Sequence, residues 1–350
     1  MTHELATASN TAQARALEAA RQGDELAFRA LVEYHLTGLH RHCYRMLGSV
    51  HDADDAVQDT LLRAWRALPR FEGRSSLRSW LYRIATNASL NMIERNPKRV
   101  LRIEGRPAGD PQLAPDPPLA ESVWLEPIPE DLEDAGVSAS PEARFEQRES
   151  LELAFVAALQ HLPPRQRAAL ILREVMGFSG AEVAEMLDTI PSSVYSLVQR
   201  AHRAVDERVP KARQQDALRA LGDRRLQQLA ARYVEAWETA DVGALAALLT
   251  EDAALSMPPL PTWFGGRDAI ATFAARGPLS PGSRWRMVPT QANGQVAFGS
   301  YLWDRTRHAY LAHCLQVLAY EPRGAITELV FFLDASLFER FALPAHLAAS

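Results

Sequence analysis

Residues 178–205, FSGAEVAEMLDTIPSSVYSLVQRAHRAV, have the pattern of two short helices around a turn. Ser179 is placed to cap the first helix, and Pro191 can begin the second, because the first amides of a helix lack partners within it. The segment predicts a helix-turn-helix whose second helix enters a DNA major groove, although an ordinary helical hairpin would show the same periodicity. The outward positions of that second helix suit base edges and phosphates: Ser192, Ser193, Tyr195, Ser196, Gln199, Arg200 and Arg203.

An earlier stretch, residues 70–99, mixes arginine with aromatic and amide side chains. Aromatic rings stack on unpaired bases while arginine neutralises phosphates, so this mixture is typical of a surface for single-stranded DNA. Residues 60–103 contain ten basic and two acidic residues, which favours an anionic partner. The alternative is that Trp80 belongs to a core and that the arginines form a solvated face.

A helix is expected just before this stretch, in DADDAVQDTLLRAWRAL at residues 52–68. Apolar residues recur there at three- and four-residue steps and form one stripe, with Val57 and Leu61 toward the core. Asp52 is the predicted N-cap, and Asp55 stands at the spacing of a capping box.

Length and composition limit the class of protein. The chain has 350 residues, of which 47% are hydrophobic, which suits two or three domains. No apolar run approaches the ~18 residues of a membrane span, and residues 1–25 contain no hydrophobic leader. Cys43 and Cys314 have no CxxC or histidine partner, so we expect free thiols, a cytoplasmic location, and no metal or cofactor.

Residues 104–141 contain eight prolines and no lysine, and residues 104–149 contain twelve acidic against three basic residues. This composition cannot bury enough apolar surface to fold alone, so it predicts an acidic, Pro-rich linker without a fixed shape. One apolar island, Trp124 and Leu125, interrupts it. We interpret the island as a docking peptide, with incidental hydrophobicity as the alternative.

The pattern becomes mixed after residue 223. Helices are expected at about 224–240 and 242–250, then a strand at 253–259 and a helix at 267–275. Four further strands are expected within 283–333, separated by turns at Asn293–Gly294 and Pro322–Gly324. This order predicts an α+β domain built on one curved antiparallel sheet.

Residues 24–99 and 147–207 together resemble the two regions of extracytoplasmic-function sigma factors of the sigma-70 superfamily. The helix at 52–68 resembles the family's polymerase-binding helix. RFEGRSSLRSWLYRIATNASLN, residues 70–91, resembles its promoter-melting and −10-reading segment, and the helix-turn-helix with the preceding LPPRQRAALILREVMG resembles its −35-binding domain. The resemblance implies a factor that binds core RNA polymerase, recognises −10 and −35 promoter elements and opens the DNA, without covalent chemistry of its own.

The resemblance also implies site residues. The polymerase would be contacted by Asp52, Asp55, Gln58, Asp59, Leu62 and Trp65. The −10 element would be contacted by Glu72, Arg74, Ser75, Ser76, Arg78, Trp80, Arg83, Asn87 and Asn91, and the −35 element by Ser193, Tyr195, Ser196, Gln199, Arg200 and Arg203. The family usually has basic residues near the positions of Tyr195 and Leu197. We therefore expect weaker binding at the −35 element, because fewer phosphates are neutralised.

The last part resembles the SnoaL-like group, which has a cone-shaped α+β fold. The resemblance lies in RRLQQLAARYVEAWETADVGALAALLTEDAALSMPP, TWFGGRDAIATFAA and FFLDASLFERF. It implies a domain that tunes polymerase binding, and the Trp124–Leu125 island resembles a linker motif of the same subgroup. Our hypothesis is that this domain packs against the two sigma regions through Trp124 and Leu125, and that polymerase or a small ligand opens the compact free protein.

Because this fold hosts enzymes, catalysis has to be judged from residues. His313 and Asp334 are the candidate pocket polars, and an apolar pocket or a plain core could be formed by Met257, Trp263, Phe264, Trp285 and Trp303. A lone buried polar side chain more often makes structural hydrogen bonds than takes part in catalysis. We therefore expect that this domain is not an enzyme. The rival readings are a dimeric helix-turn-helix repressor or activator, and an enzyme tethered to DNA.

The predicted layout is a multidomain chain of two all-α sigma domains joined by the acidic linker, followed by the SnoaL-like domain. The expected boundaries are an N-terminal extension at 1–23, region 2 at 24–100, the linker at 101–146, region 4 at 147–209, a connector at 210–222 and the SnoaL-like domain at 223–345.

Overall fold

The computed structural model describes residues 15–95, 98–103, 105–119, 123–129, 150–208 and 214–348. Parts of the expected extension, linker and connector, namely residues 1–14, 130–149 and 209–213, lie outside these ranges. The described residues divide into two compact units. The helical unit comprises residues up to 98 and residues 158–208, and the sheet unit comprises residues 99–129, 150–157 and 214–348.

Three helices form the first half of the helical unit: α2 (Glu25–Leu47), α3 (Val50–Ala67) and α4 (Leu77–Ile93). Asp24 caps α2, and Gly48 ends it with φ of 71°. The predicted cap of α3 is wrong, because Ser49 rather than Asp52 occupies the extended N-cap position and accepts from the Asp52 amide. One full turn of helix therefore precedes the predicted start.

The buried stripe of α3 also differs from the predicted one. Val57 and Leu61 are only half-buried, whereas small side chains pack closest to the neighbouring helices. A stripe of small residues allows the backbones of helices to approach closely, which periodicity of large residues does not show. The fully buried positions of α3 between its ends are Ala53, Ala56, Thr60 and Ala64.

The second half of the helical unit contains α7 (Pro164–Leu170), a single π-turn at Ile171–Val175, α8 (Gly180–Met186) and α9 (Pro191–Asp206); α6 (Leu153–Gln160) precedes them. The helix-turn-helix prediction is confirmed at this level. Ser179 and Glu182 form a complete capping box at the start of α8, and Pro191 is the first residue of α9. Asp188 makes the turn with φ of 47°.

The sheet unit has seven strands. They are β1 (Leu249–Met257), β2 (Leu260–Gly265), β3 (Trp285–Ala292), β4 (Gln295–Asp304), β5 (Ala309–Tyr320), β6 (Ile326–Phe332) and β7 (His346–Ala348). The order is β2-β1-β6-β5-β4-β3, with β7 on β5. The sheet was expected to be antiparallel throughout, but β1 and β6 pair in parallel. The sequence analysis also missed β2 and β7, which are short strands at the margin of the sheet.

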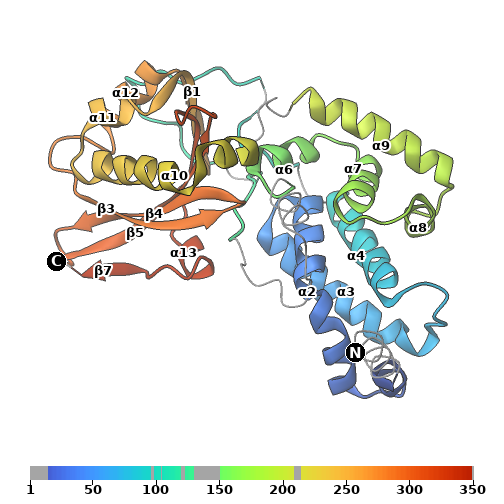
Figure 1. Ribbon diagram of the computed structural model, residues 1–350. Helices are drawn as coiled ribbons and strands as arrows, with labels where there is room; N and C mark the ends of the chain where they lie inside the picture. The colour runs from blue at the N-terminus through green and yellow to red at the C-terminus, as the bar shows by residue number, and fades with distance from the viewer. Residues whose placement is uncertain are drawn as a thin grey trace. The chain divides into compact units, whose positions relative to one another are not determined.

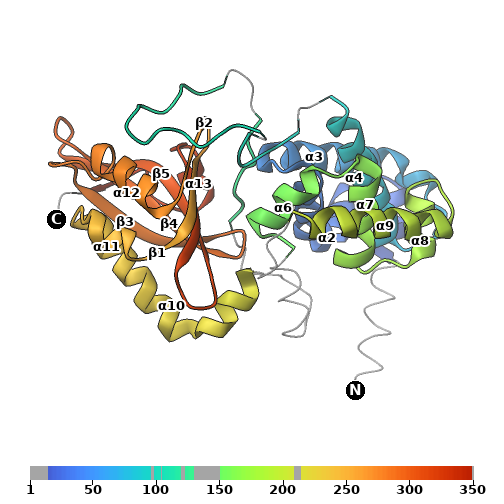
Figure 2. The same cartoon turned by 90° about the horizontal axis from the view of Figure 1, so that it is seen from above.

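Helix α10 (Gln214–Glu238) runs along one face of this sheet, with α11 (Val242–Ala246) and α12 (Arg267–Arg276) near it (Figures 1 and 2). A kink at Gly222 divides α10, so the predicted helix start near residue 224 marks its second part. The core lies between these helices and the sheet. It contains Trp237, whose ring meets those of Trp285 and Phe331 edge-on.

The described part of the linker has a defined path, contrary to the expectation of a segment without fixed shape. The described residues within 99–129, namely 99–103, 105–119 and 123–129, belong to the sheet unit, and we call them the strap. The strap first folds on itself, with the Leu125 amide donating to the Val100 carbonyl across 2.9 Å. Its composition prevents independent folding, but the SnoaL-like domain supplies the surface that the strap lacks.

Candidate nucleic-acid interface

The predicted −10 segment forms the start of α4 and the loop before it. Ser76 caps α4 through the Ser79 amide, and Glu72, Arg74 and Arg78 are exposed in or next to the loop. Trp80 is half-buried and packs on Phe71 with ring centroids 4.8 Å apart. Along the helix, Arg83 and Asn87 are half-buried and Asn91 is exposed, so the predicted side chains share one face. Ser75 is half-buried and Ser76 exposed in the same loop.

Three members of this face contact the helix-turn-helix within the helical unit. The Ser79 hydroxyl donates to Glu182 Oε1 across 2.9 Å, and Arg83 Nη2 lies 2.9 Å from Asp188 Oδ1. Arg78 donates to the Met176 carbonyl across 2.7 Å. Its guanidinium also lies over the Phe178 ring, 4.2 Å from the centroid. Part of the −10 surface of α4, around Arg78, Ser79 and Arg83, is therefore contacted by residues of α8 and its flanking loops.

The predicted polymerase-facing residues lie on the outer side of α3. Asp55 and Gln58 are exposed, Asp52 and Asp59 are half-exposed, and Asp59 pairs with Arg63 one turn later. Leu62 is 49% exposed on the same side of the helix, where an apolar side chain is available to a partner. Trp65 is half-buried against Phe28, with ring centroids 5.1 Å apart.

The recognition helix α9 has one buried and one exposed side. Val194, Val198, Ala201 and Val205 are buried, as the apolar spacing predicts. Ser193 is half-buried, and the other predicted −35 residues are exposed: Tyr195, Ser196, Gln199, Arg200 and Arg203. A polar face over an apolar one is the arrangement that places a helix in a groove.

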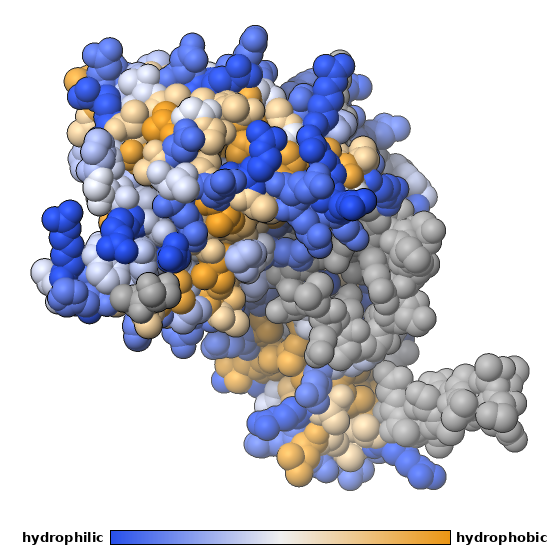
Figure 3. All heavy atoms as spheres, turned by 60° about the vertical axis from the view of Figure 1, so that its left-hand side comes forward, coloured by the Kyte–Doolittle hydropathy of each residue, from blue (hydrophilic) through white to orange (hydrophobic). Residues whose placement is uncertain are grey.

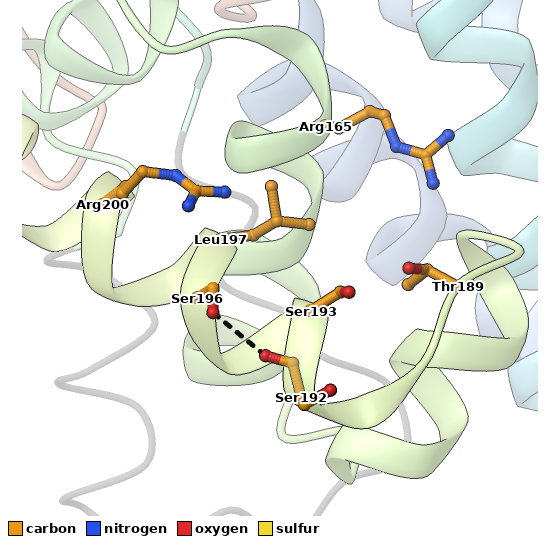
Figure 4. Close-up of a pocket in the computed structure, with 7 residues that line it drawn as sticks. All are labelled: Arg165, Thr189, Ser192, Ser193, Ser196, Leu197 and Arg200. Carbon is orange, nitrogen blue, oxygen red and sulfur yellow. Dashed lines mark hydrogen bonds between the residues drawn. The ribbon is translucent and has the colours of Figure 1, made fainter.

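An open pocket of about 460 Å³ lies at the start of α9 (Figure 4). Arg165, from α7, and Arg200 line it together with hydroxyl groups of the turn and of α9. The first amides of a helix and two guanidinium groups attract an anion such as a DNA phosphate. The sequence analysis missed Arg165 and Thr189 as members of this site. Arg165 follows Pro163 and Pro164 at a helix start, but only the packing of α7 on α9 brings it here.

A buried arginine joins the two halves of the helical unit. Arg167 is 4% exposed and donates to the carbonyls of Met46, Gln160 and Leu162. Met46 lies at the C-terminal end of α2, where unpaired carbonyls favour a cation. Burial lowers the pKa of Arg167 to about 10, so it stays charged at neutral pH.

In the sheet unit the strap is fixed at two places. At the β2 edge, the Gly109 amide donates to the Trp263 carbonyl across 2.8 Å, and Trp263 Nε1 donates to the Arg106 carbonyl across 3.0 Å. Arg102 pairs with Glu328 of β6 across 3.0 Å and lies over the Trp263 ring. At the other end, Ile128 is bound to the turn between β3 and β4.

That turn also holds the chain at the start of region 4. Asn293 Nδ2 donates to the Leu151 carbonyl across 2.7 Å, and Gln295 Oε1 accepts from the Leu153 amide across 3.0 Å. Trp124 and Leu125 are 7% and 0% exposed within the strap. One turn of the SnoaL-like domain thus fixes both ends of the acidic segment 130–149, which itself lies outside the described residues.

The interior of the sheet unit differs from the expected pocket. Met257, Phe264 and Trp285 belong to the main core, whereas Trp303 belongs to a separate cluster with Tyr310. Trp263 faces the strap. Asp334 is exposed and accepts from Ser336 in a local turn, so it does not face the core. The His313 ring meets that of the core residue Trp285 edge-on with centroids 5.3 Å apart, and partial burial lowers the pKa of His313. His313 lies opposite the register shift of the β4–β5 pair between Ser300 and Tyr301, so strict alternation does not describe β5 at this residue.

On the face shown in Figure 3, hydrophilic side chains surround several small hydrophobic areas. The large hydrophobic side chains that are most exposed among the described residues lie elsewhere than in the sheet: Leu26, Tyr34, Leu62, Leu113, Leu119, Ile190 and Tyr195. Leu62 and Tyr195 are thus exposed at the predicted polymerase and −35 positions. Within the described ranges, no helix has both the length and the apolar character to cross a membrane, and no group of three metal-binding side chains occurs.

Three family models match the chain: Sigma-70 region 2 over residues 31–99, Sigma-70, region 4 over 152–205, and a SnoaL-like domain over 230–329. The ECF RNA polymerase sigma factor SigG of Mycobacterium tuberculosis is 43% identical over 332 residues, which cover 93% of this chain and 86% of that protein. The ECF RNA polymerase sigma factor SigW of Bacillus subtilis is 28% identical over 185 residues, 53% of this chain and 90% of SigW. The solved structure of M. tuberculosis SigJ, an extracytoplasmic function sigma factor, has the same fold, with a TM-score of 0.55 and 20% identity over 89% of this chain and 98% of SigJ.

A basic helical region followed by a helix-turn-helix defines a promoter-binding transcription factor, and the matched regions make it a sigma factor. The chain belongs to the ECF sigma factors of RNA polymerase, with a SnoaL-like domain after region 4. It binds core RNA polymerase and promoter DNA and initiates transcription. The repressor reading is therefore wrong, because it leaves region 2 without a role.

Proposed function

We propose that each step of initiation uses one of the surfaces described above. The outer side of α3, with Leu62 at its centre, binds the polymerase. The face of α4 that carries Arg83, Asn87 and Asn91 binds the single strand of the −10 element. The exposed side of α9, extended by Arg165, binds the −35 element. What supports this proposal is that none of the predicted contact residues is buried, so each could reach a partner.

We assign to Arg165 and Arg200 the contacts with phosphates of the −35 element, which do not depend on the base sequence. Both line the pocket at the start of α9, where a phosphate would meet two guanidinium groups and several hydroxyls. Ser193, Ser196 and Gln199 are left for base edges. Tyr195 takes the place of a basic side chain on the same face, so affinity there depends on few phosphate contacts.

The SnoaL-like domain acts in this proposal by holding the chain rather than by catalysis. Its interior is packed with core aromatic residues, and of its two candidate acid–base residues Asp334 is exposed in a local turn while the His313 ring packs edge-on against that of Trp285. Its turn at Asn293 instead binds residues on both sides of the acidic segment. Polymerase would then bind a chain whose linker is restrained at both ends by this domain. This binding would take place in the cytoplasm, where the polymerase works.

Substitutions on single faces test the assignment. Leu62→Asp should abolish co-purification with core polymerase while leaving the far-ultraviolet spectrum unchanged, because Leu62 is exposed and lies outside the buried core. Leu113→Asp, which changes an even more exposed leucine of the strap, is the matched control. Polymerase binding by Leu62→Asp equal to that of the control would contradict the assignment of α3.

A further inference from the structure

The side of α8 that meets α4 is acidic. Glu182, Glu185 and Asp188 follow one another at three-residue steps and all reach residues of the −10 surface. Arg83 lies between two of them, 2.9 Å from Asp188 Oδ1 and 3.9 Å from Glu185 Oε1. We call these three carboxylates the acidic edge.

Glu182 has a double role in this edge. One oxygen, Oε2, accepts from the Ser179 amide and hydroxyl and completes the capping box, and the other, Oε1, accepts from Ser79. The Ser179 amide is the main reason that the pKa of Glu182 is lowered. The carboxylate is therefore ionised at neutral pH. It accepts hydrogen bonds from Ser179 at the start of α8 and from Ser79 near the start of α4.

We infer that the acidic edge is an internal competitor of promoter DNA: it occupies the −10 face of region 2 with carboxylates in the positions that DNA phosphates would take. This inference rests on the proposed role of α4 in −10 binding. A phosphate that approached Arg83 would meet the charges of Glu185 and Asp188 at close range, and like charges there disfavour binding. Arg78 is also engaged, through Met176 and Phe178. In the free protein, region 4 therefore masks the −10 face.

The mask is suited to release. The Arg83 pairs are partly exposed, with 39% of its side chain accessible, and exposed ion pairs contribute little to stability. A partner that binds regions 2 and 4 apart from each other removes the edge from α4, and it also separates the buried rings of Tyr82 and Phe178, whose centroids lie 5.2 Å apart. The apparent affinity for DNA equals the intrinsic affinity multiplied by the fraction of molecules that are unmasked.

Neutral variants of the edge test the inference in the full chain. Glu185→Gln with Asp188→Asn removes two charges and keeps both shapes, and asparagine tolerates the positive φ at position 188. Neither residue belongs to a proposed DNA-binding face. Asp206→Asn with Glu207→Gln removes the same charge from the end of α9 and is the matched control for net charge. Binding of a labelled single-stranded −10 oligonucleotide is measured without polymerase.

The edge variant should bind the oligonucleotide about two- to fivefold more tightly than the wild type, as expected for the loss of two partly exposed pairs. This increase in affinity should exceed the increase shown by the control variant Asp206→Asn, Glu207→Gln. Amide hydrogen exchange in residues 76–83 should also become faster in the edge variant only. Equal affinity and exchange in both variants would overturn the inference.

Arg83→Gln separates this inference from the proposed function. If it weakens oligonucleotide binding in the presence of core polymerase, α4 binds the −10 strand, and the edge variants alone decide whether the mask exists. If it leaves that binding unchanged, the proposed role of α4 is wrong and the inference fails with it.

Discussion

Ile128 and Asn293 hold each other through two hydrogen bonds. The Ile128 amide donates to Asn293 Oδ1 across 3.0 Å, and the Asn293 amide donates to the Ile128 carbonyl across 2.9 Å. The same asparagine side chain donates to Leu151, and its φ of 55° shapes the turn. This one residue therefore couples the end of the strap to the start of region 4.

Asn293→Gly should free both ends of the acidic segment. Glycine keeps the positive φ, so only the side-chain bonds are lost. The buried Ile128 amide and Leu151 carbonyl then lose their hydrogen-bond partner, which should lower the stability of the sheet unit by about 2 kcal/mol. Hydrogen exchange should become faster at residues 123–129 and 150–153. His308→Gly, at another positive-φ turn of the sheet, is the control and should leave both segments protected.

Gly109→Ala should displace the strap from the β2 edge. An added Cβ would lie 2.6 Å from Thr262 Cγ2, which is too close for any ordinary contact. Thr262→Ser removes that methyl group and keeps the hydroxyl that accepts from the Asp116 amide. Thermal unfolding should show a lower midpoint for Gly109→Ala and a partial return in the double variant. A loss that the serine does not relieve would point to a cause other than this contact.

The Arg102–Glu328 pair predicts a pH effect. Burial raises the pKa of Glu328, and Arg102 opposes that rise. Arg102→Met should therefore raise the pKa further. A carboxyl group with a raised folded-state pKa stabilises the fold when protonated and loses that contribution as pH increases. The variant should consequently be less stable than the wild type at pH 7, and the deficit should shrink toward pH 5.

Melting midpoints across that pH range provide the measurement for the Arg102 prediction. The double variant Arg102→Met, Glu328→Gln has no carboxyl group to titrate and is the matched control. A deficit of Arg102→Met that is constant with pH, or one that persists unchanged in the double variant, would show that the pair acts only by packing on Trp263.

Tyr195→Arg should strengthen −35 binding. It restores a basic side chain on the exposed face of α9, where Tyr195 is 56% exposed. One further neutralised phosphate should make the slope of log affinity against log salt steeper by about 1. Thr239→Arg adds the same charge at an exposed position of the sheet unit and should leave the slope unchanged. An identical slope in both variants would contradict a phosphate contact at position 195.

Local signals were sufficient for the helix-turn-helix and for most of the sheet. Ser179, Pro191 and the Asn293–Gly294 turn act through their own neighbours in sequence, so their structural roles follow from short patterns. The start of α3 was misplaced because Asp52 and Ser49 both suit a cap, and only the extended backbone of Ser49 decides between them.

The path of the linker could not be predicted, because it depends on distant residues. Nothing near Ile128 in sequence indicates that Asn293 binds it, and Gly109 becomes necessary only once Thr262 lies beside it. The masking of α4 is equally nonlocal. Glu182 reads as a capping residue, and its second bond, to Ser79, arises from packing of region 4 on region 2.

Promoter opening by the full-length protein with core polymerase tests the central claim most directly. The measurement is the fluorescence of a base analogue in the −10 element, for the wild type, Arg83→Gln and the Glu185→Gln, Asp188→Asn variant. With polymerase in excess, we predict that Arg83→Gln lowers opening severalfold, whereas the acidic-edge variant opens as much DNA as the wild type. Opening by Arg83→Gln equal to that of the wild type would contradict the account.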